Sequence, residues 1–268
     1  MSVSAHQREA VIALARQAAA EILAVYDSAS FASDAAIEHK DDRSPLTAAD
    51  LASHRCIVAG LQSLTPGIPV LSEESKDLDI AERRQWSTFW LVDPLDGTRE
   101  FIKRNGEFTV NIALIEDGVA TFGVIQQPVT GALWHGAPGA GAFRREGDTD
   151  VAIGVRKPAL APLRIAASRS HRDARTQALL DALPGSEVVG CGSSLKFCRI
   201  AEGGIDLYPR FGPTSEWDTA AGQAILEAAG GAVLDPRGRP LRYNQRDTLL
   251  NGDFLAFGDI ALRDALPA

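Results

Sequence analysis

The sequence predicts an α/β fold of the α+β kind, built from stacked layers of helices and strands in two lobes. Three observations support this prediction: helical patterns fill most of the first 64 residues, apolar strand-like segments joined by short turns follow to about residue 144, and strands then alternate with helices to the end. Helices that precede a mostly antiparallel sheet, with alternating elements after it, are typical of layered mixed folds.

The N-terminal part of the chain should contain two helices separated by a loop. Apolar residues recur at helical spacing over residues 4–26, which predicts the first helix. The polar segment 38–47 is expected to be a loop. The second helix is expected to begin near Thr47, because Thr47 and Asp50 fit a capping box.

The strands expected next are short, apolar and bounded by turns. They lie at 68–72, at 88–93, in a hairpin over 108–128 that turns at Asp117-Gly118, and near 131–135 and 141–144. Pro94 is expected to take the chain out of regular structure, because proline cannot donate a backbone hydrogen bond.

The second half of the chain is expected to alternate. Strands are expected at 163–168, 186–189, 205–209, 231–234 and 253–257, and helices at about 172–182, 193–202 and 219–229. Asp218 could cap the last of these helices, which should stop at Gly230-Gly231. Residues 150–162 show neither helical nor strand periodicity, so the lobes are expected to be residues 1–155 and 156–268.

Composition excludes several classes of protein. The formal net charge is -8, which argues against a surface for nucleic acid polymers, since such surfaces are normally basic. No stretch approaches the roughly 20 apolar residues of a transmembrane segment. Only three cysteines occur, too few for a disulfide framework, so they are expected to be reduced and mostly buried. We therefore expect a cytoplasmic protein, with peripheral association with the inner membrane left open.

Several acidic residues could hold metal ions, although each also has a simpler explanation. Asp50 could be a helix cap and nothing more. Asp96-Gly97 is a common turn pair, and Glu73 could lie in a solvated loop. Glu73, Asp93 and Asp96 nevertheless all follow apolar strands, where a rigid scaffold presents side chains to a cleft. Carboxylates that converge there would repel one another unless cations were bound.

Hard cations such as Mg²⁺ would relieve that repulsion, because they prefer oxygen ligands. With Asp218, the cluster would carry four negative charges, which two Mg²⁺ ions would balance. Two such ions can clamp a phosphoryl group between them. The turn at 94–97 could point Asp93, the Leu95 carbonyl and Asp96 the same way, with the Thr98 hydroxyl beside them.

These residues stand in motifs that resemble the inositol monophosphatase superfamily of Mg²⁺-dependent, lithium-sensitive phosphatases. The motifs are "TAAD" with Asp50, "SEES" with Glu73, "DPLDGT" at 93–98 and "WD" at 217–218, and they cover most of the chain in the family's order. The resemblance implies an αβαβα sandwich with two or three Mg²⁺ ions and inhibition by Li⁺. The metal ligands that it implies are Glu73, Asp93, the carbonyl of Leu95, Asp96 and Asp218.

The same resemblance assigns roles around the metals. It implies that Asp50 and Thr98 orient and deprotonate the attacking water, and that Gly97 and Thr98 offer backbone N–H groups to the phosphate. Besides these two residues, the implied contacts to substrate include Glu73, Leu95, Asp96 and Asp218. A homodimer is also expected from the family.

Within that superfamily, the segment 93–118 and the stretches "GSSLKFC" and "LYPRFGPTSEWDTAAG" look most like the 3'(2'),5'-bisphosphate nucleotidase branch. That branch removes the 3'-phosphate from adenosine 3',5'-bisphosphate, a by-product of sulfate assimilation. Arg210 stands where the inositol-specific branch has a glutamate, and an arginine suits a phosphate. Ser193 and Lys196, expected on one helix face, could join it around a second phosphate. Lys196 and Arg210 could instead form an ordinary solvated surface.

Three functions stay open from the sequence. The first is hydrolysis of the 3'-phosphate of a small bisphosphonucleotide. The second is a phosphatase of inositol phosphate or of another sugar phosphate. The third is a protein that binds a nucleotide through metals without catalysis, which the presence of both Asp50 and Thr98 disfavours.

Overall fold

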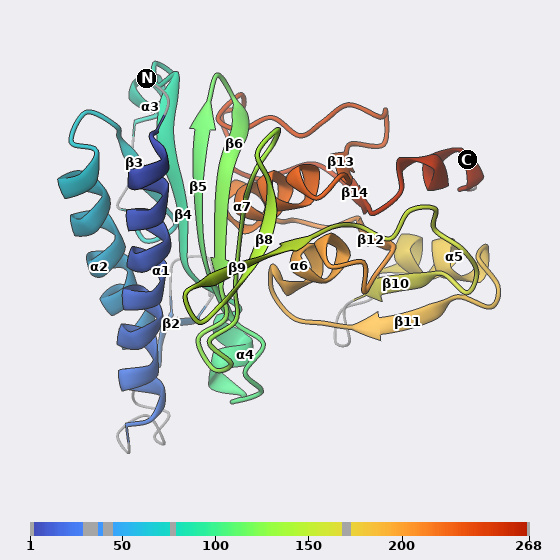
Figure 1. Cartoon of the computed structure of the whole chain (residues 1–268), viewed down its shortest axis with the longest axis horizontal. Helices are drawn as coiled ribbons and strands as arrows, with labels where there is room; N and C mark the ends of the chain where they lie inside the picture. The colour runs from blue at the N-terminus through green and yellow to red at the C-terminus, as the bar shows by residue number, and fades with distance from the viewer. Residues whose placement is uncertain (1–2, 29–36, 40–44, 76–78, 168–172, 267–268) are drawn as a thin grey trace.

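The computed structural model describes residues 3–28, 37–39, 45–75, 79–167 and 173–266. Figure 1 shows five layers in the order helix, sheet, helix, sheet, helix, which confirms the predicted αβαβα architecture. Within the described ranges, no helix is both long and apolar enough to cross a membrane.

The first helical layer forms where the sequence predicts it. Helix α1 (Ala5–Tyr26) begins after Ser4, which forms a capping box with Gln7. Helix α2 (Ala48–Leu64) begins after Thr47, and its capping box with Asp50 is present as expected. The segment expected to be a loop instead contains a small antiparallel pair, β1 (Ile37–His39) and β2 (Pro45–Thr47).

The larger sheet has seven strands in the order β3-β4-β5-β6-β7-β8-β9. Strand β3 pairs parallel with β4, and every other pairing in this sheet is antiparallel. The strands are β3 (Val70–Ser72), β4 (Thr88–Asp96), β5 (Thr109–Glu116), β6 (Val119–Gln126), β7 (Leu133–Ala137), β8 (Gly141–Glu146) and β9 (Thr149–Ile153). The hairpin turn falls at Asp117-Gly118 as predicted, with positive φ at both residues.

The prediction that Pro94 ends its strand is wrong. Strand β4 continues to Asp96, and its register with β5 shifts by one residue between Asp93 and Asp96. A bulge of this kind is a place where a sheet tolerates proline. The site depends on this irregularity, as described below.

The middle helical layer lies between the two sheets. It consists of α6 (Leu195–Ala201) and α7 (Glu216–Ala228), and α7 packs across β5, β6 and β7. Gly123 permits the close approach of α7, since a Cβ atom there would lie 2.4 Å from the Ala221 carbonyl oxygen. One apolar core therefore runs from the larger sheet through α7 into the second sheet.

The second sheet has five strands in the order β11-β10-β12-β14-β13. They are β10 (Arg164–Ala167), β11 (Glu187–Gly190), β12 (Leu207–Arg210), β13 (Ala232–Leu234) and β14 (Phe254–Phe257). Helix α5 (Ala174–Asp181) and the 3₁₀ helix η3 (Ile260–Ala265) pack on its outer face. Among the described residues, the remaining helices are the short α3 (Ile80–Arg83) and α4 (Thr98–Ile102).

The two sheets fall on either side of the boundary expected between residues 155 and 156. We propose that the boundary separates two lobes of one folding unit, because the core around α7 contains buried residues from both sides. All three cysteines are free; Cys198 is buried, while Cys56 and Cys191 are partly buried.

Candidate active site

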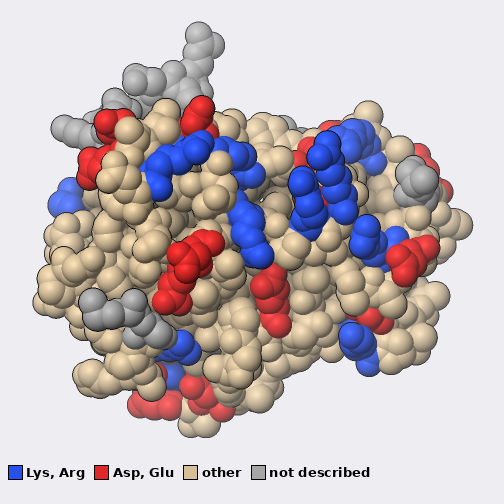
Figure 2. Space-filling model, turned by 90° about the horizontal axis from the view of Figure 1, so that it is seen from above, with Lys and Arg blue, Asp and Glu red and all other residues tan. Residues whose placement is uncertain are grey.

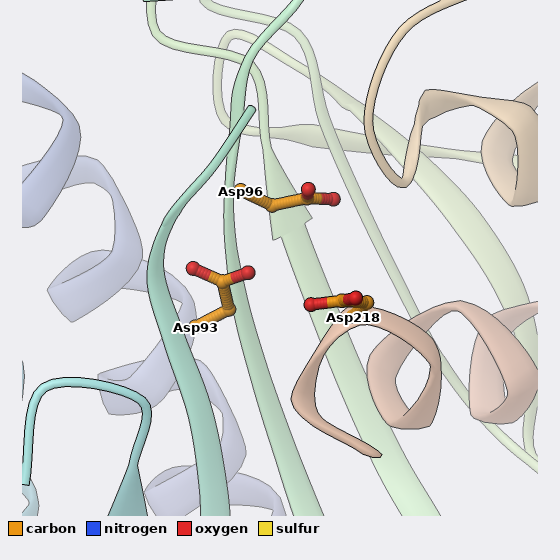
Figure 3. Close-up of side chains that lie close together, drawn as sticks. All are labelled: Asp93, Asp96 and Asp218. Carbon is orange, nitrogen blue, oxygen red and sulfur yellow. The ribbon is translucent and has the colours of Figure 1, made fainter. Parts of the chain in front are cut away.

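Three aspartates from two elements form a carboxylate cluster. Asp93 and Asp96 come from β4 and Asp218 from the first turn of α7, and one carboxylate oxygen of each lies within 4.8 Å of the others. Figure 3 shows the three side chains directed into one space between the strand and the helix.

The bulge in β4 makes this convergence possible. In a regular strand, residues three apart point to opposite faces of the sheet. The register shift between Asp93 and Asp96 adds one residue to β4 opposite β5, so both side chains can turn toward α7. Gly97 then adopts a left-handed conformation with φ of 94° and starts α4, a geometry that strains any residue with a Cβ.

Asp218 reaches the cluster from a position other than the one predicted. The predicted cap at Asp218 is wrong: α7 begins at Glu216, its N-cap is Ser215, and Asp218 is the third helical residue. Asp218 Oδ2 accepts a hydrogen bond from the Ser215 backbone N at 2.9 Å. The carboxylate therefore closes a capping box and faces the cluster at the same time.

Glu73 lies in the turn directly after β3, and its backbone N donates to the Val92 carbonyl at 3.0 Å. Its carboxyl group lies close enough to Asp93 to raise the pKa of that aspartate. Glu73 therefore lies next to Asp93, as its position at the end of an apolar strand predicts. That strand, β3, pairs parallel with β4.

The electrostatics of the cluster favour a cation. Burial raises the pKa of Asp93 well above its ordinary value, and the negative charges of Glu73, Asp96 and Asp218 raise it further. Burial also raises the pKa of Asp218, with further contributions from Asp96 and Glu73. A bound cation would offset the repulsion between carboxylates held together in this way. The residues present therefore fit a site for hard metal ions.

Asp50 and Thr98 form a pair beside the cluster. Asp50 is 2% exposed, and its Oδ2 accepts hydrogen bonds from the Thr47 backbone N at 2.8 Å and from Thr47 Oγ1 at 2.6 Å. Its other oxygen, Oδ1, lies 3.3 Å from Thr98 Oγ1. Thr98 Oγ1 also lies 3.4 Å from the carbonyl oxygen of Leu95. Asp50 thus caps its helix with one oxygen and faces Thr98 with the other.

A pocket of about 250 Å³ opens beside the cluster, between α4, the N-terminus of α6 and the end of β12. Asp96 and Asp218 lie on its wall, together with Ser193, Lys196 and Arg210. Four acidic and four basic residues line it in all; these are Asp96, Glu100, Glu107 and Asp218, and Arg99, Lys103, Lys196 and Arg210. Its formal charge is therefore close to zero without metal and positive with it.

The residues predicted to bind substrate, Ser193, Lys196 and Arg210, line the same pocket, but Ser193 and Lys196 do not lie on one helix face. Ser193 lies outside α6 with φ of 42°, so the expectation that Ser193 and Lys196 share one helix face is wrong. Lys196 is 7% exposed, its Nζ donates to the Ser193 carbonyl at 3.0 Å, and it lies 5.2 Å from the ring centre of Tyr208. The reading of Lys196 as a solvated surface residue is therefore wrong as well.

Arg210 lies at the end of β12 and is partly exposed. Its Nε donates to Thr214 Oγ1 and its Nη2 to the Pro213 carbonyl, both at 2.8 Å. These bonds fix the guanidinium on the pocket wall. A fixed guanidinium can meet an anion at a small entropic cost.

Sequence reasoning missed two buried polar residues next to the cluster, Ser194 and Asn111. Both contact Asp96. The second serine of "SSLK" and a polar residue inside the apolar run 109–115 are signals in the sequence, but neither identifies Asp96 as the partner.

The layered fold and the partly buried carboxylate cluster together are typical of metal-dependent phosphatases. A model of the inositol monophosphatase family matches residues 6–261. The chain belongs to the inositol monophosphatase family.

Close relatives lie in one branch of that family. The chain is 51% identical over 247 residues to the 3'(2'),5'-bisphosphate nucleotidase CysQ of Salmonella typhimurium, covering 92% of this chain and 97% of the relative. It is 49% identical over 244 residues to that of Escherichia coli K12, covering 91% and 96%. Among solved structures, CysQ from Bacteroides thetaiotaomicron matches with a TM-score of 0.82 and 41% identity, covering 93% of this chain and 96% of that one.

Proposed function

We propose that the chain is a metal-dependent 3'(2'),5'-bisphosphate nucleotidase. It removes the 3'-phosphate from adenosine 3',5'-bisphosphate and gives AMP and phosphate, a reaction linked to sulfate assimilation. One observation carries this proposal: a single pocket joins a carboxylate cluster to a wall of basic side chains, so a substrate can place one phosphate at each. About 50% identity to bisphosphate nucleotidases over more than nine tenths of the chain supports it.

The metal site that we propose holds two or three Mg²⁺ ions. Its ligands are Glu73, Asp93, the carbonyl oxygen of Leu95, Asp96 and Asp218. When bound, the ions balance charge on the phosphoryl oxygens and lower the pKa of water at the site. Li⁺ is expected to inhibit the enzyme.

Asp50 and Thr98 act together on the attacking water. Thr98 Oγ1 donates toward Asp50 Oδ1, so the threonine oxygen can accept a proton from water while the threonine proton passes to Asp50. Asp50 is held for this purpose by two donors from Thr47. No nucleophilic side chain is required, because water attacks the phosphorus directly. The backbone N–H groups of Gly97 and Thr98 are proposed to bind the transferred phosphate.

The second phosphate is bound at the basic wall. Ser193, Lys196 and Arg210 line the pocket on the side formed by α6 and β12. Lys196 is mostly buried, so its charge acts in an environment less polar than water. An arginine and a lysine there favour a phosphate over a sugar hydroxyl.

The surface charge supports a small substrate over a nucleic acid polymer. On the face seen in Figure 2, lysine and arginine side chains gather in groups, but aspartate and glutamate side chains lie beside them. A surface that binds a phosphate backbone usually carries one continuous basic patch.

A substrate panel tests the proposal. With Mg²⁺, the purified protein is expected to release phosphate from adenosine 3',5'-bisphosphate far faster than from inositol 1-phosphate or a sugar phosphate. Faster turnover of inositol phosphate would replace the substrate assignment by the monophosphatase alternative. Tight, metal-dependent nucleotide binding without any turnover would replace it by the binding-protein alternative.

The panel should be repeated with Li⁺, which is expected to lower the rate. Gel filtration checks the homodimer, and cell fractionation checks the cytoplasmic location and any peripheral association with the inner membrane. These three remain predictions from the family resemblance and the sequence.

The substitution Arg210→Glu is expected to lower kcat/KM for adenosine 3',5'-bisphosphate about 10- to 100-fold. A hydrogen bond to a charged group contributes about 1.5–3 kcal/mol, and the new carboxylate would also repel the phosphate. Adenosine 3'-monophosphate lacks the second phosphate, so its kcat/KM should change much less.

Arg237→Glu is a matched control, because it makes the same change of charge on an exposed residue that lines a different pocket. It should leave both substrates unaffected. Equal losses for the two substrates in Arg210→Glu would show that Arg210 does not recognise the second phosphate.

A further inference from the structure

A buried polar network ties the N-terminus of α6 to the carboxylate cluster. Ser194 is the N-cap of α6 and is 2% exposed. Its backbone N and its Oγ each lie 2.6 Å from Asp96 Oδ2. A residue from the second lobe therefore binds a carboxylate of the first.

Asn111 completes the network from β5. It is 1% exposed, and its Nδ2 lies 2.9 Å from Ser194 Oγ and 3.4 Å from Asp96 Oδ2. Thr109 Oγ1 donates to Asn111 Oδ1 at 2.9 Å, which fixes the orientation of the amide. Asn111 is thus held so that it donates toward both Ser194 and Asp96.

The single hydroxyl proton of Ser194 has two acceptors. Ser194 Oγ accepts from Asn111, and it lies 2.6 Å from Asp96 Oδ2 and 2.7 Å from the carbonyl oxygen of Asp218. The proton can serve only one of these acceptors at a time. Asp96 is the stronger acceptor when ionised, because hydrogen bonds to charged groups are the strong ones.

The network uses only one oxygen of the Asp96 carboxylate. Among the described residues, every hydrogen bond to this side chain ends on Oδ2. Oδ1 is the oxygen left for a cation. The hydrogen bonds to Oδ2 therefore fix the orientation of the Asp96 carboxylate and leave Oδ1 to face a cation.

We infer that Ser194, supported by Asn111, is a positioning residue that orients Asp96 for metal binding. The inference rests on the proposed function, since it takes Asp96 as a ligand. It adds that the hydroxyl of Ser194, which lines the same pocket as Lys196 and Arg210, raises the affinity of the metal site. Partners that orient metal ligands typically change affinity 10- to 100-fold when removed.

The test is the substitution Ser194→Ala, which removes the hydroxyl and keeps the backbone donor. Mn²⁺ alone is titrated into the metal-free protein, and the free ion is followed by electron paramagnetic resonance. The variant is expected to bind Mn²⁺ about 10- to 100-fold more weakly than the parent. In assays, half-maximal activity should need a similarly higher Mg²⁺ concentration, while KM for the nucleotide at saturating Mg²⁺ should change less than about twofold.

Thr176→Val is a matched control. Thr176 is 5% exposed, and its N and Oγ1 donate at 2.9 and 2.6 Å to the carboxylate oxygens of Asp173, the N-cap of α5; it is not among the residues that line the pocket. It is expected to lower the unfolding temperature but not the Mn²⁺ affinity, so it separates lost stability from lost positioning. Ser194→Thr retains the hydroxyl and should restore binding, and Ser194→Cys, with a weak donor, gives a second variant if alanine prevents folding.

The outcomes are distinct. Unchanged Mn²⁺ affinity in folded Ser194→Ala or Ser194→Cys overturns the inference and leaves the proposed function intact. A parent protein that binds no metal, or releases no phosphate, contradicts the proposed function itself.

Discussion

Replacing Asp93 by asparagine is expected to remove nearly all phosphatase activity while the chain stays folded. Asp93 is 1% exposed, and the negative charges of Glu73, Asp96 and Asp218 all act on it. The substitution removes a negatively charged side chain from the proposed metal site. A metal contributes several kcal/mol to the stabilisation of the transition state, and a loss of about 4 kcal/mol lowers the rate about a thousandfold.

The same substitution should not destabilise the metal-free protein. The raised pKa of Asp93 means that the folded chain binds this proton more tightly than the unfolded chain does. Such a group lowers stability as the pH rises above its unfolded pKa, because ionisation then costs more in the folded state. Asparagine carries no charge, and its Oδ1 can keep the hydrogen bond from the Leu95 backbone N. In EDTA at pH 7 we expect an unfolding temperature equal to or above that of the parent.

Thermal unfolding with and without Mg²⁺ provides the measurement. The parent should gain stability when Mg²⁺ is added, because a ligand that binds only the folded state stabilises it. Asp93→Asn should gain little. Asp181→Asn, a change of the same kind on the exposed surface of α5, should behave like the parent in both assays. Retained activity in Asp93→Asn would contradict the role of Asp93 as a ligand.

Local signals in the sequence were enough to predict most of the fold. The capping box at Thr47 and the turn at Asp117-Gly118 depend on residues within four positions of one another, so their chemistry is visible in the sequence. The prediction that β4 ends at Pro94 was wrong. Proline locally disfavours a strand, but the tertiary pairing of β4 with β5 outweighs this preference. The pairing of β4 with β5 continues past the proline, and a bulge absorbs it.

The site was predictable in part for the same reason. The order of carboxylates along the chain indicated which elements must meet, and the structure does bring Asp93, Asp96 and Asp218 together. The contacts of Ser194 could not be predicted, since Asp96 is 98 positions away in the sequence. Only the tertiary fold, which brings the N-cap of α6 to the last residue of β4, joins them.

The substitution Asp50→Asn should separate proton transfer from metal binding. The capping box requires an oxygen opposite the Thr47 backbone N, so the amide oxygen will take the place of Oδ2. The amide NH₂ group must then face Thr98 Oγ1, where Oδ1 stood. It can only donate there, so it can no longer accept the proton from Thr98.

We expect kcat to fall about 100- to 10,000-fold, the usual contribution of a general base, with Mn²⁺ affinity near that of the parent. Thr98→Val should give a similar loss, and the double variant should be little worse than either single one, because groups that act as a unit are not additive. Stability should fall by only about 0.3–1 kcal/mol, the value of one negative charge in the first turn of a helix. Activity within threefold of the parent would mean that Asp50 only caps α2, whereas a matching loss of Mn²⁺ affinity would place it among the metal ligands.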